Sequence, residues 1–173
     1  MHTNMIIKNN ISLVKVDFSH PDFIKEQGND LLLLLNAYAC DPMGGGQALS
    51  KYTQENLLAC LIQRTDIYTV ISYIDGNPAG LINAIEGFST FNAKPLLNIH
   101  DVTVLSKYRG LGLSKLMFKK IEELAKKRDC CKVTLEVLEG NEHAKNIYSQ
   151  LGYVAYELDP RMGNALFLEK KLS

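Results

Sequence analysis

The segment best suited to chemistry lies where a predicted strand turns into a predicted helix, at Arg109-Gly110-Leu111-Gly112-Leu113-Ser114. Glycines at such a turn let the backbone approach a ligand closely, and the first N–H groups of the helix have no partner within it. Basic residues flank the turn, at Lys107, Lys115 and Lys119. Cations at this end of a helix oppose its dipole, and a bound anion would offset the cost. The segment therefore predicts a phosphate-binding turn.

The spacing of the glycines narrows the kind of phosphate ligand. A P-loop requires GxxxxGK followed by Ser or Thr, and the sequence contains no such string. A dinucleotide fingerprint, GxGxxG, would begin at Gly110 and Gly112, but its third position is Lys115. Neither nucleotide-binding motif is therefore predicted.

The spacing instead resembles the acetyl-CoA loop of the GNAT family of N-acetyltransferases, which has Arg or Gln, two residues, Gly, one residue, then Gly or Ala. Arg109 and Gly112 match this pattern, and Ser114 stands at its last position. A second block at residues 141–153 is similar to the family's Asn-x-x-Ala-x-x-x-Tyr-x-x-x-Gly-Phe/Tyr element, through Asn141, Ala144, Tyr148, Gly152 and Tyr153. The resemblance covers residues 67–173.

The resemblance implies an α/β fold, with a central mixed, mostly antiparallel sheet of six to seven strands flanked by about four helices. It also implies acetyl-CoA as the cosubstrate. The main chain of a central strand would pair with the pantetheine arm, and the glycine turn would hold the pyrophosphate. The cofactor-binding residues implied in this way are Val102, Thr103, Val104, Arg109, Gly110, Leu111, Gly112, Leu113, Ser114, Asn141 and Tyr148.

Amide formation requires a base, an oxyanion donor and an acid. An alkyl ammonium has a pKa of about 10 and must lose a proton before its nitrogen can attack a thioester. The resemblance gives the role of acid, protonating the departing CoA thiolate, to Tyr148; the alternative is that Tyr148 is a core aromatic of an amphipathic helix. Main-chain N–H groups of a splayed or bulged central strand are the expected donors to the oxyanion.

The candidates for the base are His100 and Asp101 on the predicted central strand. Neighbours in a strand point to opposite faces, so at most one of them faces the pocket directly. The family often has an acidic residue near this position that acts through water, while His100 has the better ordinary pKa for the task. Glu86 and Glu136 are further alternatives.

These residues together predict an acetyl-CoA-dependent N-acetyltransferase. The acetyl group would pass to the amine of a small molecule or amino acid by direct attack in a ternary complex. A non-catalytic acyl-CoA-binding sensor on the same fold is the alternative, which Tyr148 disfavours. O-acetyl transfer and longer acyl donors stay open, and no residue names the acceptor.

Composition fits one globular domain over residues 1–173, with 46% hydrophobic and 22% charged residues. The longest leucine run, at residues 31–35, is too short to span a membrane, and the N-terminus lacks the apolar core of a signal peptide. The four cysteines lack CxxC spacing, so neither a metal site nor a disulfide framework is predicted. We expect a cytoplasmic protein.

The net charge of zero hides an asymmetry. Residues 1–105 contain six Lys and Arg against ten Asp and Glu, and residues 106–173 contain thirteen against nine. The basic part suits a polyanionic cofactor and the acidic part a cationic amine, although splits of this size also occur without either partner. The sequence contains no basic patch interleaved with aromatic residues, so nucleic-acid binding is not predicted. A homodimer is plausible by family analogy alone.

The first part of the chain predicts a strand at 12–18, a helix at 22–39 and a second helix at 50–64 with Leu57, Leu58, Leu61 and Ile62 buried. The glycine-rich segment between the helices, residues 41–47, is expected to be irregular. It would serve either as a flexible connector or as a lid beside the acceptor site, and family resemblance favours the lid.

The remaining elements predicted are strands at 67–74 and 79–86 joined by a hairpin turn, and a central strand at 96–105. The segment between the last two, residues 87–95, is predicted to be a loop, either bordering the acceptor pocket or packed on the core. A helix at 113–127 follows, with Leu113, Leu116, Met117, Ile121, Leu124 and Ala125 on its buried face. A strand at 132–137, a helix capped by Asn141 and strands at 153–158 and 164–172 complete the series.

Overall fold

The computed structural model describes residues 10–20, 22–156, 159, 161, 163 and 165–172. Contacts within the chain divide it into two compact units, Met1–Leu135 and Glu136–Ser173. The first unit contains the whole sheet. The single domain expected over residues 1–173 stays a prediction.

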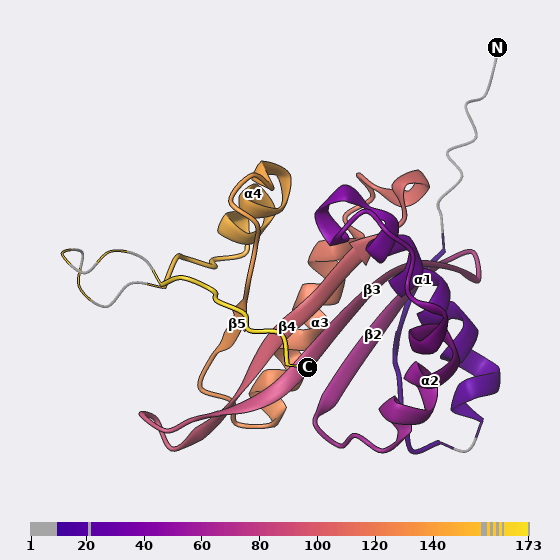
Figure 1. Ribbon diagram of the computed structural model, residues 1–173, viewed down its shortest axis with the longest axis horizontal. Helices are drawn as coiled ribbons and strands as arrows, with labels where there is room; N and C mark the ends of the chain where they lie inside the picture. Colours follow the sequence, from indigo (N-terminus) through magenta and orange to yellow (C-terminus); the bar gives the residue numbers. More distant parts are fainter. Residues whose placement is uncertain are drawn as a thin grey trace, which may run out of the picture. The chain divides into compact units, whose positions relative to one another are not determined.

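Five strands form one sheet in the order β1-β2-β3-β4-β5 (Figure 1). The first four strands pair antiparallel, and β5 runs parallel to β4. A tight turn with a positive φ at Gly76 joins the second strand to the third. The prediction of a mixed, mostly antiparallel sheet in an α/β fold is therefore confirmed. The strands are β1 Ile11–Lys15, β2 Ile67–Ile74, β3 Asn77–Ser89, β4 Lys94–Val104 and β5 Val133–Leu135.

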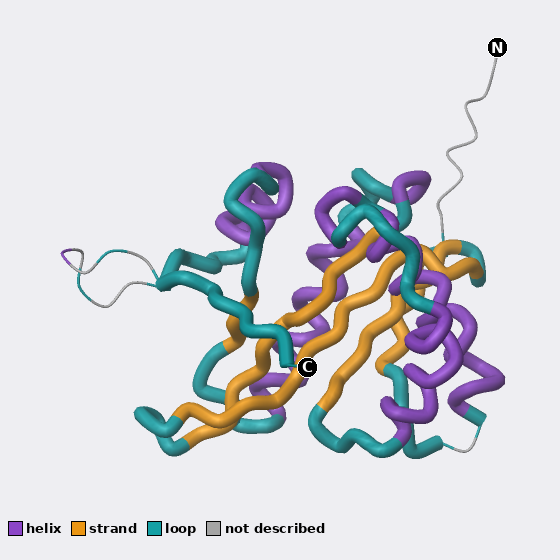
Figure 2. Tube along the Cα trace, in the orientation of Figure 1, coloured by secondary structure: helices purple, strands orange, loops and turns teal. Residues whose placement is uncertain are grey.

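Helices cover both faces of this sheet, as the tube in Figure 2 shows. On one face, side chains of α1 (Asn29–Cys40) and α2 (Lys51–Ile62) pack with Ile71 and Leu81 of the sheet. On the other face, Leu113 of α3 (Leu113–Lys127) packs with Ile74 and Ala79. Within the described part of the chain no helix is long and apolar enough to cross a bilayer.

The amphipathic pattern of α3 places its side chains largely as predicted. Leu113, Met117, Ile121 and Ala125 are all buried. Three positions differ: Phe118, which the pattern left out, is fully buried, Leu116 is 40% exposed, and Leu124 is only partly buried. The apolar face of α3 is therefore shifted toward Phe118 by less than one residue, since a helix advances about 100° per residue and four of the predicted positions remain buried.

The first part of the chain differs from the sequence prediction at element ends. Strand β1 stops at Lys15, although Val16 and Phe18 beyond it are buried. A π-helical turn, Ile24–Gly28, precedes α1. In α2 the hydroxyl of Ser50 accepts a hydrogen bond from the N–H of Thr53, which explains where the helix begins. Its predicted buried face is partly wrong, because Ile62 is 43% exposed.

Strands β3 and β4 extend through most of residues 87–95, so the loop predicted there is wrong. Phe88 lies opposite Pro95, and Ser89 opposite Lys94, so only a short turn remains. Phe91 at this turn is 99% exposed. At the usual rise of a strand, this turn lies about 20 Å along β4 from Asp101. It is therefore far from both candidate bases on β4, His100 and Asp101.

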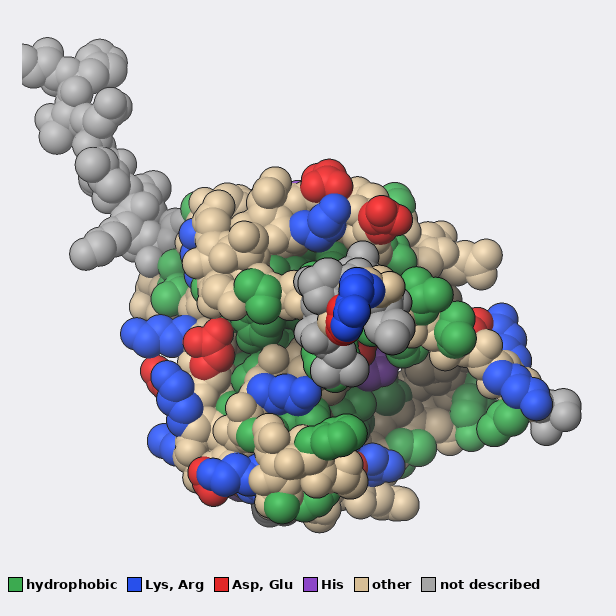
Figure 3. Space-filling model, turned by 90° about the vertical axis from the view of Figure 1, so that its left-hand side faces the viewer, with side chains coloured by type: hydrophobic (Ala, Val, Ile, Leu, Met, Phe, Trp, Pro, Cys, Tyr) green, Lys and Arg blue, Asp and Glu red, His purple; other side chains and the backbone are tan. Residues whose placement is uncertain are grey.

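The second unit contains the helix α4 (Glu142–Gln150). The strands expected at 153–158 and 164–172 are absent from the described residues 153–156 and 165–172; residues 157, 158 and 164 lie outside them. Large apolar side chains there are exposed by 80% or more, at Val154, Leu166, Phe167, Leu168 and Leu172. A strand forms only where a neighbour pairs with it, so alternation alone misled the prediction. The described residues form a sheet of five strands, where six to seven were expected. Apolar side chains also reach the surface among charges of both signs in Figure 3.

Candidate active site

Strand β4 carries a bulge at its centre. Asn83 of β3 lies opposite Asp101, whereas the next residue, Ala84, lies opposite Ile99. His100 is therefore an extra residue on β4. An extra residue bends the strand and interrupts the hydrogen-bond ladder locally. The central strand therefore has the bulge that was expected for an oxyanion site. It lies at His100, one of the two candidate bases.

Strand β5 pairs with β4 only on the N-terminal side of the bulge. The parallel pairing joins Leu97, Asn98 and Ile99 to Val133, Thr134 and Leu135. Beyond Ile99, β4 continues to Val104 with no strand beside it on that side among the described residues. Among the described residues no strand therefore pairs with β4 on this side from His100 to Val104, an arrangement in which an extended ligand can add to the edge of the sheet.

The ladder decides which of the predicted pantetheine-binding residues face this side of β4. The N–H of Leu105 donates to the carbonyl oxygen of Ala79 at 2.9 Å. Backbone groups along an antiparallel pair alternate between facing the partner strand and facing away from it. Val102 and Val104 therefore turn their N–H and C=O groups away from β3, toward this side. The backbone groups of Thr103 belong to the ladder, so two of the three residues suit the predicted role.

The glycine turn follows a short 3-10 helix, Ser106–Tyr108. Gly110 and Gly112 have φ of +81° and +77°, and a Cβ at either position would meet no protein atom within 4 Å. The buried side chain of Leu113 anchors the start of α3, so the first N–H groups of this helix point at the space beside the turn. A strongly anionic group such as a pyrophosphate fits this arrangement of donors and open space.

Replacing Gly112 with Ala is expected to weaken binding of acetyl-CoA, the cosubstrate that the sequence predicts, on the order of tenfold, equivalent to about 1.4 kcal/mol. The added methyl occupies the open space beside the helix N-terminus, and the left-handed φ of this residue strains any L side chain. Calorimetric titration with acetyl-CoA measures the effect. Gly76→Ala is the matched control, because this residue has the same φ of +77° and equally open surroundings in the β2–β3 turn. Equal weakening in both variants would contradict the assignment.

Arg109 makes contacts that its place in the motif does not predict. Its Nε donates to the carbonyl oxygen of Val104 at 3.1 Å, and its Nη2 donates to Oδ2 of Asp41 at 2.9 Å. The N–H of Met43 and this guanidinium together lower the pKa of the Asp41 carboxyl. Arg109 therefore links the glycine turn to the segment after α1. Arg109 and Asp41 are 68 positions apart, so no local sequence pattern could have predicted this pair.

The glycine-rich segment after α1 is folded tightly rather than irregular throughout. It contains a 3-10 turn, Pro42–Gly44, and the N–H of Gln47 donates back to the carbonyl oxygen of Ala39. A Cβ on Gly44 would lie 2.0 Å from the carbonyl oxygen of Tyr38. The first glycine is therefore required by close packing against α1, which disfavours the flexible-connector interpretation.

Asp101 is the better placed of the two candidate bases. Its Oδ2 accepts a hydrogen bond from the amide of Asn83 at 2.9 Å, and its side chain is 27% exposed. The side chain of His100 is 63% exposed, with its Nδ1 3.7 Å from the Asp101 carboxylate. Burial raises the pKa of Tyr38 on α1, and the nearby carboxylates of Asp101 and Asp41 raise it further. The Asp101 carboxylate is therefore partly buried and held by one hydrogen bond, whereas Asp41 is already paired with Arg109.

Glu86 is poorly suited to act as the base. Its carboxylate forms an ion pair with Arg128 through both oxygens and accepts a hydrogen bond from the hydroxyl of Tyr68. Chiefly because of Arg128, the pKa of Glu86 is lowered from its usual 4.5. A carboxylate held ionised in this way is a weak proton acceptor. The other alternative, Glu136, belongs to the second unit.

The Glu86 ion pair predicts a pH dependence of stability. Because the folded pKa lies below the unfolded value near 4.5, the pair stabilises the fold above that pH, and the stabilisation disappears as the pH falls through the folded pKa. Glu86→Gln is expected to lower the free energy of unfolding on the order of 1 kcal/mol at pH 7. Urea denaturation of both proteins from pH 7 down to 3 measures the difference, which should shrink only below about pH 4.5. A constant difference would contradict an ionic origin.

In the second unit, the side chain of Asn141 caps α4 by accepting a hydrogen bond from the N–H of Ala144 at 3.1 Å. Gly152, with φ of +89°, follows the end of the helix. The ring of Tyr148 packs edge-on against that of Tyr153, with 6.3 Å between centroids. The second sequence block therefore specifies a capped helix that carries Tyr148.

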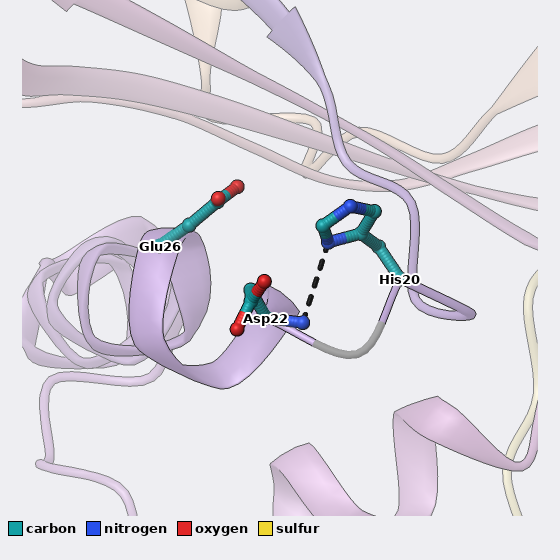
Figure 4. A group of neighbouring side chains, drawn as sticks. All are labelled: His20, Asp22 and Glu26. Carbon is teal, nitrogen blue, oxygen red and sulfur yellow. Dashed lines mark hydrogen bonds between the residues drawn. The ribbon is translucent and has the colours of Figure 1, made fainter.

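One group of possible metal ligands occurs within the described residues, at His20, Asp22 and Glu26 (Figure 4). All three side chains are exposed. The Nδ1 atom of His20 already accepts a hydrogen bond from the N–H of Asp22. This arrangement serves to begin the turn before α1 and adds nothing to the site on β4.

Comparison with known proteins agrees with this geometry. Residues 33–153 match the family model described as "Acetyltransferase (GNAT) family". Thialysine N-epsilon-acetyltransferase of Caenorhabditis elegans is 27% identical over 93 residues, which cover 54% of this chain and 58% of the relative. The chain thus spans little more than half the length of this curated relative.

Solved structures of acetyltransferases share the fold. Ribosomal-protein-alanine N-acetyltransferase from Brucella melitensis biovar Abortus 2308 superposes with a TM-score of 0.69 and 15% identity, covering 87% of this chain and 96% of that one. Aminoglycoside N-acetyltransferase AAC(6')-Iy in complex with CoA gives a TM-score of 0.71 and 13% identity, covering 95% and 97%. At such identities the likeness concerns the fold.

Proposed function

Because the chain belongs to the acetyltransferase (GNAT) family, we propose that it transfers an acetyl group from acetyl-CoA to the amine of a small molecule or amino acid. The observation that carries the proposal is the coincidence, within one unit, of the β4 bulge, the open side of β4 and the glycine turn. These features support acetyl transfer because a bulge frees main-chain N–H groups for the acyl carbonyl oxygen. The open side of β4 can pair with the pantetheine arm, and the glycine turn can bind the pyrophosphate.

The donor would lie along the open side of β4. The backbone groups of Val102 and the N–H of Val104, whose carbonyl oxygen already accepts from Arg109, pair with the amides of the pantetheine arm. The N–H groups at the start of α3 bind the pyrophosphate. This placement brings the acetyl thioester to the bulge at His100. Main-chain N–H groups at the bulge then stabilise the negative charge that develops on the carbonyl oxygen.

The reaction needs no covalent intermediate with the protein. Asp101, directly or through a water, takes a proton from the acceptor's ammonium group, and the neutral nitrogen attacks the thioester carbon. The resulting tetrahedral adduct loses the second proton of its cationic nitrogen to solvent and collapses with cleavage of the C–S bond. The CoA thiolate leaves and is protonated by the phenol of Tyr148, whose role is carried over from the family's second motif. The products are the acetylated amine and CoA.

The acceptor is best described as a cationic amine. Asp101 and Asp41 both raise the pKa of Tyr38 on α1, and Asp41 is itself paired with Arg109. The Asp101 carboxylate attracts an ammonium group and disfavours an anionic acceptor. The worm relative's name specifies the ε-amine of thialysine, which is also a cationic amine. The cytoplasmic location and the homodimer stay predictions from the sequence.

The test is release of CoA thiol from acetyl-CoA across a panel of diamines, amino acids, aminoglycosides and amino sugars. Turnover with a cationic acceptor supports the proposal. Thermal stabilisation by acetyl-CoA without turnover on any acceptor would favour the rival, an acyl-CoA-binding sensor. Absence of stabilisation by acetyl-CoA would overturn the cofactor assignment and the function with it.

A further inference from the structure

A buried polar relay crosses the centre of the sheet and ends on Asp101. The hydroxyl of Thr69 on β2 donates to Oδ1 of Asn83 on β3 at 2.5 Å. The amide of Asn83 donates in turn to Oδ2 of Asp101 on β4 at 2.9 Å. Thr69 is fully buried and Asn83 is 8% exposed. Three adjacent strands thus contribute one polar side chain each to a single row.

The direction of this relay is fixed by the carboxylate at its end. An ionised carboxylate only accepts hydrogen bonds, so the NH2 group of Asn83 must face Asp101. The amide oxygen then faces Thr69, whose hydroxyl supplies the donor that this oxygen needs. Thr69 therefore selects one of the two orientations of the Asn83 amide, and that orientation holds the Asp101 carboxylate.

Packing alone gives no reason for polar groups at this place. Ile71 and Leu81 lie two residues further along the same strands, on the same face, and belong to the apolar core beneath α1 and α2. Hydrocarbon side chains at positions 69 and 83 would continue that core, and exchanging both members of a buried hydrogen-bonded pair for apolar groups of the same shape is often neutral or stabilising. Retained polar groups of this kind occur at functional sites.

The bulge explains why Asp101 requires such a support. Asn83 is the residue directly opposite Asp101, and the register breaks at the next pair because His100 is extra. A bulge re-aims the side chains that follow it and loosens the ladder around them. The amide of Asn83 replaces that lost constraint from the neighbouring strand.

We infer that Asn83, oriented by Thr69, is a positioning residue that aims the Asp101 carboxylate at the acceptor's ammonium group, an inference that rests on the proposed function. Neither side chain takes part in proton transfer. Their effect therefore falls on kcat, through the geometry of Asp101, and leaves acetyl-CoA binding along β4 unchanged.

Three variants of the full chain test the relay. Thr69→Val removes the hydroxyl and keeps the shape, and kcat is expected to fall about tenfold while KM for acetyl-CoA stays within about twofold. Thr69→Ser retains the hydroxyl and should restore most of the activity. Ser72→Ala is the matched control, because Ser72 is also a fully buried β2 hydroxyl but donates to the carbonyl oxygen of Gly80, away from Asp101. Its kcat should not change.

A double variant separates positioning from stability. Thr69→Val combined with Asn83→Leu replaces the whole buried pair by hydrocarbon, so its melting temperature should be at least that of the wild type. Its kcat should still fall about tenfold, and Thr69→Val should have no further effect in an Asp101→Asn background. Wild-type kcat in the stable double variant, or an undiminished effect of Thr69→Val without Asp101, would overturn the inference alone. Absence of wild-type turnover with every acceptor would overturn the proposed function together with the inference.

Discussion

Replacement of Asp101 by Asn is expected to lower kcat/KM for the acceptor amine by about 100-fold, the usual range for loss of a general base being 10² to 10⁴. Asn has the shape of Asp and its oxygen can still accept the hydrogen bond from Asn83, so the fold and the bulge are preserved. What it loses is the ability to take a proton from an ammonium group. Steady-state kinetics with the best acceptor of the panel measure the change.

Acetyl-CoA binding and the alternative base supply the controls for this result. The dissociation constant for acetyl-CoA should be unchanged in Asp101→Asn, because the donor is expected to contact the main chain of β4. His100→Gln should lower kcat/KM by no more than about fivefold, since this side chain is largely exposed and lacks the Asn83 hydrogen bond. If the losses are reversed between the two variants, His100 is the base and the relay through Asn83 has a different purpose.

Features specified by neighbouring residues could be predicted from the sequence. The glycine turn and the helix that follows it are one continuous segment, so the positive φ at Gly110 and Gly112 and the burial of Leu113 follow from local backbone rules. The cap of α4 by Asn141 is likewise local. The backbone of the glycine turn and the start of α3 were therefore predictable almost residue by residue, and phosphate binding there stays a prediction.

Features that depend on strand pairing could not be predicted in the same way. The bulge at His100 and the separation of β5 from β4 after Ile99 are properties of register, which no single segment encodes. The Asp41–Arg109 pair and the Thr69–Asn83–Asp101 relay join residues far apart in the chain. The preference for Asp101 over His100 as the proposed base consequently rests on contacts that only the structure provides.

Removal of the Tyr148 hydroxyl is expected to lower kcat about tenfold or more, because the CoA thiolate would have to leave without a proton donor. Tyr148→Phe keeps the ring that packs edge-on against Tyr153, so α4 should remain folded. Its kcat is measured with saturating acetyl-CoA and the best acceptor. Tyr153→Phe is the matched control, since it removes a hydroxyl from the partner ring without touching the proposed acid, and its kcat should be unchanged.

The identity of the leaving group separates an acid from a residue that merely binds CoA. A general acid matters most when the departing thiolate is basic, and less when the thiol is acidic enough to leave unassisted. The loss of kcat in Tyr148→Phe should therefore be smaller with the acetyl thioester of thiophenol, a more acidic thiol, than with the acetyl thioester of pantetheine. A defect of equal size with both donors would contradict proton transfer by Tyr148, and a defect seen only as a higher KM for acetyl-CoA would assign this residue to cofactor binding instead. Only the first pattern, a loss of kcat that tracks the basicity of the thiolate, makes the second sequence block part of the chemistry.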